Sequence, residues 1–236
     1  MRQDKLKTYQ NVFDKTTLTS LYKLSDGGYL KELFGRIAEG KESHVFYATN
    51  QRDEPVVVKI FLVEASDFKT MNKYIKGDPR FQGLKRKKRT LVHAWAKKEY
   101  QNMLRARDAG IHVPTPYAIK NNVLIMEFIG KKGFASPLAK NSVPKKKQDW
   151  KECIEHMINA LWNDAKLVHA DLSEYNILNH NGEPVFIDWS SGVLVQHPLA
   201  KEFLAKDIKN MFAWLKSIGA KPTSEEEFFK HVIGNV

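Results

Sequence analysis

The sequence predicts an α+β protein, in which an antiparallel sheet with one long helix comes before a mostly helical part. Runs rich in β-branched and aromatic residues, broken by turn formers, occupy residues 35–62 and 117–128. A helical pattern free of proline and glycine lies between them, over residues 90–109. Amphipathic helices over about 150–165 and 198–215 dominate the rest. A chain of 236 residues can bury a substantial core, as one domain or a compact two-lobed unit.

Composition limits the classes of function. The net charge of +11 favours a polyanionic partner. No apolar run approaches the ~18 residues of a membrane span, so we expect a soluble protein of the cytoplasm without a membrane partner. The single cysteine, Cys153, excludes an internal disulfide and a cysteine-based metal cluster. It falls on the apolar side of a predicted helix, which favours a buried side chain.

The N-terminal residues 1–34 are expected to form a helical extension of one or two short helices, the second running from Tyr29 to Phe34. From Gly35 the pattern changes to strands, and residues 40–43 (GKES) stand at the tip of the first strand pair. A glycine at such a tip allows close approach of the backbone, so this turn could cover phosphates. An ordinary hairpin turn is the alternative.

Lys59 interrupts the apolar strand over residues 56–61. It alternates with Val57 and Phe61, so it should point with them toward a core-like face, where an unpaired charge is costly. Glu99 is the only acidic residue of the helix over 90–109 before Asp108, and we predict it as the partner. A lysine at the sheet edge that extends to solvent is the alternative.

Positive charge gathers in residues 85–89 (KRKKR), with Lys97 and Lys98 soon after, and in residues 145–147. We expect residues 76–89 to form a flexible basic loop. One interpretation is a solvated connection kept open by charge repulsion. The other is a contact surface for RNA phosphates or an acidic assembly partner, with Phe81 exposed for stacking.

The stretch from Leu167 to Gly192 carries most of the chemistry. Short apolar runs flank the turn formers of residues 179–182 and predict a hairpin. Asp171 comes just before this hairpin, Asn176 follows five positions later, and Asp188 comes just after it. Phosphoryl transfer needs a divalent metal held by carboxylate and amide oxygens, and a carboxylate that orients the attacking hydroxyl. We predict Asn176 and Asp188 as Mg²⁺ ligands and Asp171 as the base; a polar loop shaped by turn chemistry alone is the alternative.

The spacing of His169, Asp171 and Asn176 matches the catalytic loop of protein kinases. The full sequence of this loop, HADLSEYN (residues 169–176), resembles the RIO family of atypical protein kinases, of the Rio-one type. The same resemblance is carried, in order, by GKES, VVKI, AWAKKEYQNM, VPTPY, VLIMEFIG, FIDW and HPLAKEFLAKDI. It implies a two-lobed protein-kinase-like fold, with an N-lobe of antiparallel sheet plus helix over 35–127 and a mostly helical C-lobe over 128–236. The catalytic loop would be 168–176 and the metal loop 187–192.

The resemblance also implies ATP and Mg²⁺ as cofactors, with Mn²⁺ as a possible substitute. The backbone at Glu127 and Ile129 would bind adenine, with Met126 behind it. The further nucleotide contacts implied are the shortened phosphate loop, Gly40, Lys41, Glu42 and Ser43, and three other residues, Lys59, Glu99 and Ser173.

In function, the resemblance implies a serine/threonine kinase and ATPase that acts in maturation of the small ribosomal subunit, with the pre-ribosomal subunit and its RNA as partners. Asp188 could itself become phosphorylated during an ATPase cycle. The ordinary D-F-G and A-P-E motifs are missing, so we expect a fold without the usual activation segment and peptide-binding part. Two alternatives stay open. The wording IDW is familiar in small-molecule phosphotransferases of the aminoglycoside and choline kinase type, and the basic charge fits a nucleotide-gated factor that binds pre-ribosomal RNA with little turnover.

Overall fold

The computed structural model describes residues 13–64, 68–84 and 87–234. The chain divides into two compact units. The first comprises Met1–Asn72, Arg80–Tyr100 and Thr115–Phe128, and the second comprises Lys73–Pro79, Gln101–Pro114 and Ile129–Val236.

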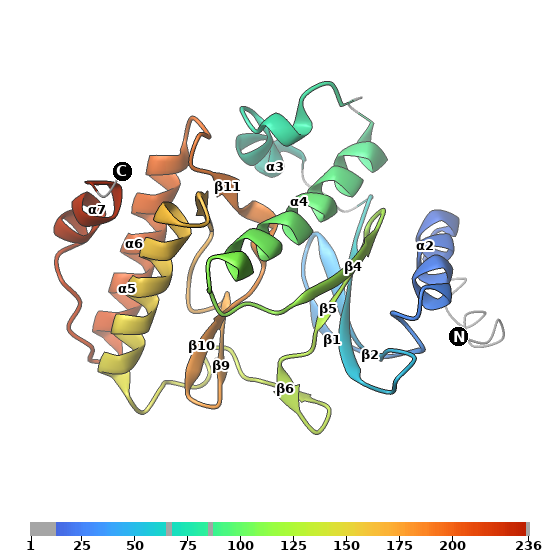
Figure 1. Cartoon of the computed structure of the whole chain (residues 1–236), viewed down its shortest axis with the longest axis horizontal. Helices are drawn as coiled ribbons and strands as arrows, with labels where there is room; N and C mark the ends of the chain where they lie inside the picture. Colours follow the sequence, from blue (N-terminus) through green and yellow to red (C-terminus); the bar gives the residue numbers. More distant parts are fainter. Residues whose placement is uncertain (1–12, 65–67, 85–86, 235–236) are drawn as a thin grey trace. The chain divides into compact units, whose positions relative to one another are not determined.

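A five-stranded antiparallel sheet forms the centre of the first unit (Figure 1). The strand order is β1-β2-β3-β5-β4. The central strand β3 is buried from Val56 to Phe61, and its β-branched side chains suit a position between two paired neighbours. The strands are β1 (Glu32–Glu39), β2 (Ser43–Thr49), β3 (Pro55–Phe61), β4 (Pro116–Lys120) and β5 (Val123–Glu127).

Helix α2 (Lys15–Asp26) precedes the sheet and packs its apolar side into the same core cluster as strands β3 and β5. Asp14 caps it by accepting from the backbone N–H of Thr16 at 2.8 Å. The second helix expected over Tyr29–Phe34 is wrong: strand β1 already begins at Glu32, which pairs with Thr49. Pairing with β2 and burial of side chains in the sheet core outweigh the local pattern there. Residues 1–12 lie outside the described part.

The long helix expected over 90–109 is α4 (Lys88–Asp108). Two details of its surface differ from expectation. Leu104 is exposed, whereas Lys98 is almost completely buried, with its Nζ 4.1 Å from the centre of the Trp95 ring. The burial of Lys98 therefore removes it from the expected positive surface.

The segment before α4 contains two short helical elements, and residues 85 and 86 of the expected loop 76–89 lie outside the described part. Helix α3 (Phe68–Ile75) comes first and was not predicted, and a short 3-10 turn, η1 (Pro79–Phe81), follows. Phe81 is buried, with its ring 6.4 Å from that of Trp95. The expectation that Phe81 is exposed for stacking is therefore wrong, because its ring contributes to the core instead.

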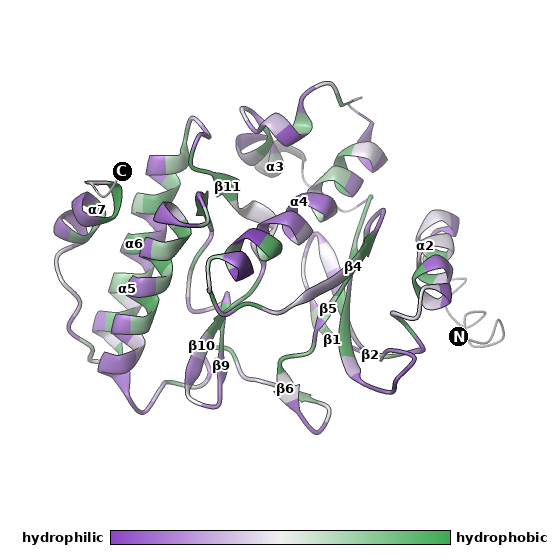
Figure 2. Cartoon of the chain, in the orientation of Figure 1, coloured by the Kyte–Doolittle hydropathy of each residue, from purple (hydrophilic) through white to green (hydrophobic). Residues whose placement is uncertain are grey.

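The second unit is built around three helices, α5 (Lys147–Asn163), α6 (Ala200–Ser217) and α7 (Glu225–Gly234). Figure 2 shows apolar and polar residues following each other along α5 and α6, as expected of helices with one buried side. The predicted apolar stripe of α5 is buried, apart from Cys153, which is only partly buried. Ser224 caps α7 by accepting from the N–H of Glu227 at 3.1 Å, as the capping-box pattern predicts.

Short strand pairs complete the second unit. Strands β8 (Leu167–Val168) and β11 (Val193–Leu194) pair, as do β9 (Ile177–His180) and β10 (Glu183–Phe186). A further pair of two-residue strands, β6 (Gly130–Lys131) with β7 (Phe134–Ala135), comes before α5. None of the helices in the described part combines the length and apolar character of a membrane span.

Candidate active site

The β9–β10 hairpin brings two of the predicted site residues to one place in the second unit. Its turn consists of Asn181 and Gly182 alone, with φ values of 54° and 94°, which is the backbone of a tight hairpin turn. At the open end, Phe186 pairs with Ile177, and the N–H of Ile187 donates to the carbonyl oxygen of Asn176 at 3.0 Å. Asn176 therefore lies directly before the first strand of the hairpin, and Asp188 lies two residues after the end of the second strand. The predicted hairpin is confirmed, with longer strands and a shorter turn than expected.

Asp171 lies in the loop that leads into this hairpin. The Asn176 side-chain nitrogen donates to the backbone carbonyl oxygen of Asp171 at 2.8 Å, and the His169 Nε2 donates to the carbonyl oxygen of Ile187 at 3.0 Å. Ala170, just before Asp171, has a φ of 67°, a left-handed conformation that costs free energy in a residue other than glycine. The second unit thus brings together Asp171, Asn176 and the segment that carries Asp188.

The segment after Asp188 is anchored from helix α4. The Asn102 side-chain nitrogen donates to the carbonyl oxygens of Trp189 at 2.8 Å and Gly192 at 2.9 Å. A Cβ at Gly192 would lie 2.7 Å from that nitrogen, so only glycine fits without a shift. Asp188 itself has a left-handed φ of 62°, and its Oδ1 accepts from the Ser190 hydroxyl at 3.0 Å. The loop therefore has a fixed shape set by buried contacts.

Asn176 and Asp188 offer a donor set that fits a magnesium ion. Because the nitrogen of the Asn176 amide is directed at Asp171, the amide oxygen is turned toward an acceptor role. One carboxylate and one amide oxygen are hard ligands, and Mg²⁺ typically takes few protein oxygens and keeps several waters. In the part of the chain that the structure describes, no cluster of three or more His, Cys, Asp or Glu side chains could hold a metal. The two residues thus suit a Mg²⁺ bound mainly through substrate and water.

Helix α6 holds the loop around Asp171 through a buried carboxylate. Asp207 is 2% exposed, and its oxygens accept from the backbone N–H groups of Ala170 at 2.7 Å and Leu172 at 2.9 Å. Burial raises the pKa of Asp207 to about 7, and the two N–H donors oppose that rise only in part. Sequence reasoning missed Asp207. Its signal was an acidic residue on the apolar side of the predicted helix, beside Leu204.

Lys206, the preceding residue of α6, contacts Asp171 directly. Its Nζ lies 3.2 Å from Asp171 Oδ1, and about half of each side chain is exposed. Burial by itself would lower the pKa of Lys206, but the hydrogen bond and the attraction to Asp171 outweigh it, so the pKa is raised. Lys206 therefore carries a full positive charge beside the predicted base at neutral pH. No local pattern indicates this contact, because 35 residues separate the two side chains in the sequence.

In the first unit, Lys59 and Glu99 form the predicted ion pair. Lys59 Nζ lies 2.9 Å from Oε1 and 2.8 Å from Oε2 of Glu99. The two side chains are 6% and 1% exposed, which excludes the alternative of a lysine extended to solvent. The pairing is confirmed, and the predicted contact of Lys59 with phosphates stays a prediction.

The predicted phosphate loop is the turn between β1 and β2. The N–H of Gly40 donates to the carbonyl oxygen of Ser43 at 2.9 Å, and the carbonyl oxygen of Glu42 accepts from the N–H of Leu62 at 2.9 Å. Lys41 at the tip is exposed. The turn is therefore tight and fixed to the end of β3, with a basic side chain at its exposed tip.

The residues predicted to bind adenine lie at and after the end of β5. Met126 pairs with Val57, and the N–H of Glu127 donates to the carbonyl oxygen of Thr115 at 2.8 Å. Because the Glu127 N–H already donates to Thr115, the predicted contact with adenine would use the carbonyl oxygen of Glu127 as an acceptor. Ile129 begins the second unit, and its carbonyl oxygen accepts from the N–H of Ser136 at 2.9 Å.

Ser173 is held inside the loop between Asp171 and Asn176. Its carbonyl oxygen accepts from the N–H of Asn176 at 2.9 Å, and its side chain is partly exposed. The hydrogen bond closes a turn that sets the path of the chain from the base to the amide ligand. The predicted nucleotide contact of Ser173 stays a prediction.

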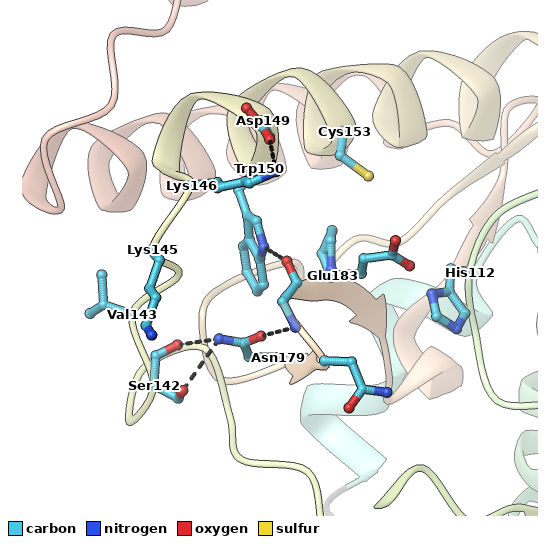
Figure 3. A pocket seen from close by; sticks show the side chains of 13 residues that line it. His112, Ser142, Val143, Lys145, Lys146, Asp149, Trp150, Cys153, Asn179 and Glu183 are labelled. Atoms are coloured by element: carbon cyan, nitrogen blue, oxygen red, sulfur yellow. Dashed lines mark hydrogen bonds and ion pairs between the residues drawn. The ribbon is translucent and has the colours of Figure 1, made fainter.

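A separate cavity of about 870 Å³ lies at the other end of the hairpin (Figure 3). The indole of Trp150 reaches toward the hairpin tip, where its Nε1 donates to the carbonyl oxygen of Gly182. None of the predicted site residues lines it. Its lining residues are His112, Ser142, Val143, Lys145, Lys146, Asp149, Trp150, Cys153, Asn179, Asn181, Gly182, Glu183 and Pro184.

Comparison with known proteins supports the same interpretation. A family model of the RIO domain matches residues 44–228. The chain is 40% identical over 217 residues to the RIO-type serine/threonine-protein kinase Rio1 of Haloferax volcanii, covering 92% of this chain and 74% of that protein. It is 42% identical over 206 residues to Rio1 of Methanocaldococcus jannaschii, with coverage of 87% and 70%. The human serine/threonine-protein kinase RIO1 is 36% identical over 230 residues, which are 95% of this chain and 40% of the human protein.

Among solved structures, the Rio2 kinase of Chaetomium thermophilum in an ADP/Mg²⁺-phosphoaspartate complex matches with a TM-score of 0.71 and 20% identity. The match covers 91% of this chain and 66% of that one. The fold and these relatives together define an enzyme of the protein-kinase class. The chain belongs to the RIO domain family, and the expected α+β kinase-like fold is confirmed.

Proposed function

We propose that this protein is a serine/threonine kinase and ATPase that uses Mg²⁺-bound ATP. The observation that carries the proposal is the hairpin of the second unit: Asn176 lies directly before its first strand and Asp188 shortly after its second, and the Asn176 amide donates to the backbone carbonyl oxygen of Asp171. Phosphoryl transfer is catalysed mainly by positioning and electrostatic stabilisation, and this arrangement supplies both.

The proposal assigns a role to each residue of the site. Asp171 accepts the proton of the attacking hydroxyl, and Asn176 and Asp188 hold the metal. When bound, Mg²⁺ (or Mn²⁺ in its place) neutralises charge that develops on the phosphates. Lys59, fixed by Glu99, is the cation for the α- and β-phosphates, and its buried pairing keeps the ammonium in one position.

Asp188 also has a second role in the proposal. Its carboxylate oxygen can attack the γ-phosphorus, so that an O–P bond forms, the β–γ bridging bond breaks and ADP leaves. Water then hydrolyses the acyl phosphate, and the cycle consumes one ATP without a protein acceptor. The fixed shape of the loop supports this role, because the Ser190 hydroxyl and the Asn102 amide hold the loop in place.

We further propose that the biological partner is the pre-ribosomal small subunit and its RNA, in the cytoplasm. The net charge of +11 supports a polyanionic partner. If five basic residues of the segment 76–89 bind phosphates, log K would fall with log salt with a slope of about −3.5 to −4.5. Binding of labelled small-subunit RNA at several salt concentrations, with and without ATP, measures this slope. A flat salt dependence would exclude the RNA contact and leave the kinase proposal standing.

The decisive experiment follows the label from γ-labelled ATP with Mg²⁺ in the purified protein. Acid-stable label on serine that is lost in Asp171→Asn supports the kinase; hydroxylamine-sensitive label that is lost in Asp188→Asn supports the ATPase cycle. Asp171→Asn should slow serine transfer about 10²- to 10⁴-fold and keep ATP affinity within a few-fold. The control is Asp149→Asn, which removes a carboxylate from an exposed position in α5. Label transferred only to an added amino alcohol such as choline would refute the proposal in favour of a small-molecule kinase.

A further inference from the structure

Helix α6 contacts the loop of Asp171 through three side chains that differ in kind. Asp207 accepts from the N–H groups of Ala170 and Leu172, and the Asn210 amide donates to the carbonyl oxygen of Leu172 at 3.2 Å. Both are contacts to backbone. Lys206 instead reaches a side chain, the carboxylate of Asp171. The backbone contacts already fix the loop, so the lysine is not needed to hold it.

The stabilisation that Lys206 gives to the fold is also small. The two side chains of the pair are 47% and 51% exposed, and ion pairs at such exposure stabilise a fold only weakly because solvent screens them. A cation beside a base also weakens the base, since it favours the charged form of the carboxylate. The position of Lys206 beside Asp171 is therefore better explained by a contact that Lys206 makes with bound substrate.

The chemistry of the site calls for a cation at this position. During transfer, negative charge spreads over the three equatorial oxygens of the phosphoryl group, and positive groups around it stabilise the transition state. Between Asp171 and Asn176 the loop reads LSEY, without any basic residue. The catalytic loop itself thus brings no positive charge to the phosphoryl group, and α6 does.

We propose that Lys206 is a catalytic residue that binds the equatorial oxygens of the transferring phosphoryl group while Asp171 holds the attacking hydroxyl; this rests on the proposed kinase function. A hydroxyl bound to Asp171 lies about 2.7 Å from its carboxylate, and the reacting phosphorus about 3–3.5 Å beyond. Lys206 Nζ is 3.2 Å from Oδ1 of that carboxylate. Rotation of a flexible lysine side chain is enough to bring its ammonium to the phosphoryl oxygens.

The protonation state of Lys206 does not change during the transfer step. The serine hydroxyl gives its proton to Asp171, its oxygen bonds to the γ-phosphorus, and the bond to the β–γ bridging oxygen breaks, so that ADP leaves with the electron pair. Lys206 stays protonated throughout and moves from Asp171 toward the phosphoryl oxygens. As Asp171 becomes neutral, the lysine loses one anionic partner and gains another.

The test compares Lys206→Met and Lys206→Arg with the parent protein in serine phosphorylation of casein and of the chain itself. We expect Lys206→Met to lower kcat about 100-fold with KM for ATP changed less than three-fold, and Lys206→Arg to restore part of kcat. The matched control is Lys209→Met, which removes an exposed lysine from the same helix. A thermal melt of each variant measures stability separately.

The outcomes separate this inference from the proposed function. A Lys206→Met protein with parental or higher kcat, in a parent whose turnover depends on Asp171, overturns the role of Lys206 and leaves the kinase intact. An equal loss in Lys209→Met also overturns it, because the effect would then be one of helix charge. A parent that transfers no phosphate to serine refutes the kinase part of the proposed function, and the inference fails with it.

Discussion

The buried carboxylate of Asp207 should make the stability of this protein depend on pH in a defined window. Its pKa in the folded chain is about 7, against an ordinary value of 3.8. Below pH 4 the carboxyl group is protonated in both the folded and unfolded states. As the pH rises from about 4 to about 7, the unfolded chain loses the proton and the folded chain keeps it, so the free energy of unfolding falls. At about 1.4 kcal/mol for each pH unit, the loss amounts to about 4 kcal/mol and is complete above pH 7.

Comparison of the parent with Asp207→Asn isolates this contribution. Asparagine keeps one acceptor oxygen but sets an N–H₂ group against a backbone N–H of Ala170 or Leu172, which costs about 1–3 kcal/mol at every pH. The difference in unfolding free energy between the two proteins, from urea denaturation at pH 4.5 to 8, should therefore shift by several kcal/mol in favour of the variant as the pH rises. Asp149→Asn controls for the loss of one carboxylate. A difference that stays constant within 1 kcal/mol across this range would refute the raised pKa.

Two further predictions concern buried contacts of the site. Glu99→Leu removes the carboxylate that pairs with the buried charge of Lys59 and should lower the free energy of unfolding by about 3–5 kcal/mol, whereas adding Lys59→Met should restore most of it. Urea denaturation that shows equal loss in the single and double variants would contradict this. Gly192→Ala places a Cβ 2.7 Å from the Asn102 amide nitrogen and should cost about 1–3 kcal/mol and weaken Mg²⁺-dependent turnover. Gly35→Ala, where nothing lies within 4 Å of the added carbon, is the control and should stay near parental stability.

Local patterns predicted the parts of the site that depend on neighbours in sequence. The Asn181-Gly182 turn determines the hairpin, and the hairpin determines where Asn176 and Asp188 lie. Lys59 could be matched to Glu99 because the helix over 90–109 offers no other acidic residue before its last turn. In each case one strong local signal led to the prediction, and for Lys59 the burial of the pair then excluded the alternative.

Contacts between distant segments were not predictable in the same way. Asp207, Lys206 and Asn102 act on backbone or side chains 35 or more residues away, and no spacing rule connects such positions. Phe81 looked like an exposed aromatic in a basic loop, yet burial against Trp95 decides its place. The prediction of a helix over Tyr29–Phe34 was wrong for a related reason, since pairing with β2 determines the conformation from Glu32 onward.

The left-handed conformations of Ala170 and Asp188 have a consequence for how this site can change. Each costs about 1–3 kcal/mol in a residue that has a side chain, and glycine would relieve that strain at once. At position 188 glycine would remove the carboxylate. At position 170 it would loosen the chain beside Asp171, because glycine has more conformational freedom than alanine. A protein engineer who selects for thermal stability alone would therefore be led to replace Ala170, and would gain a more robust fold with a less well-ordered catalytic loop.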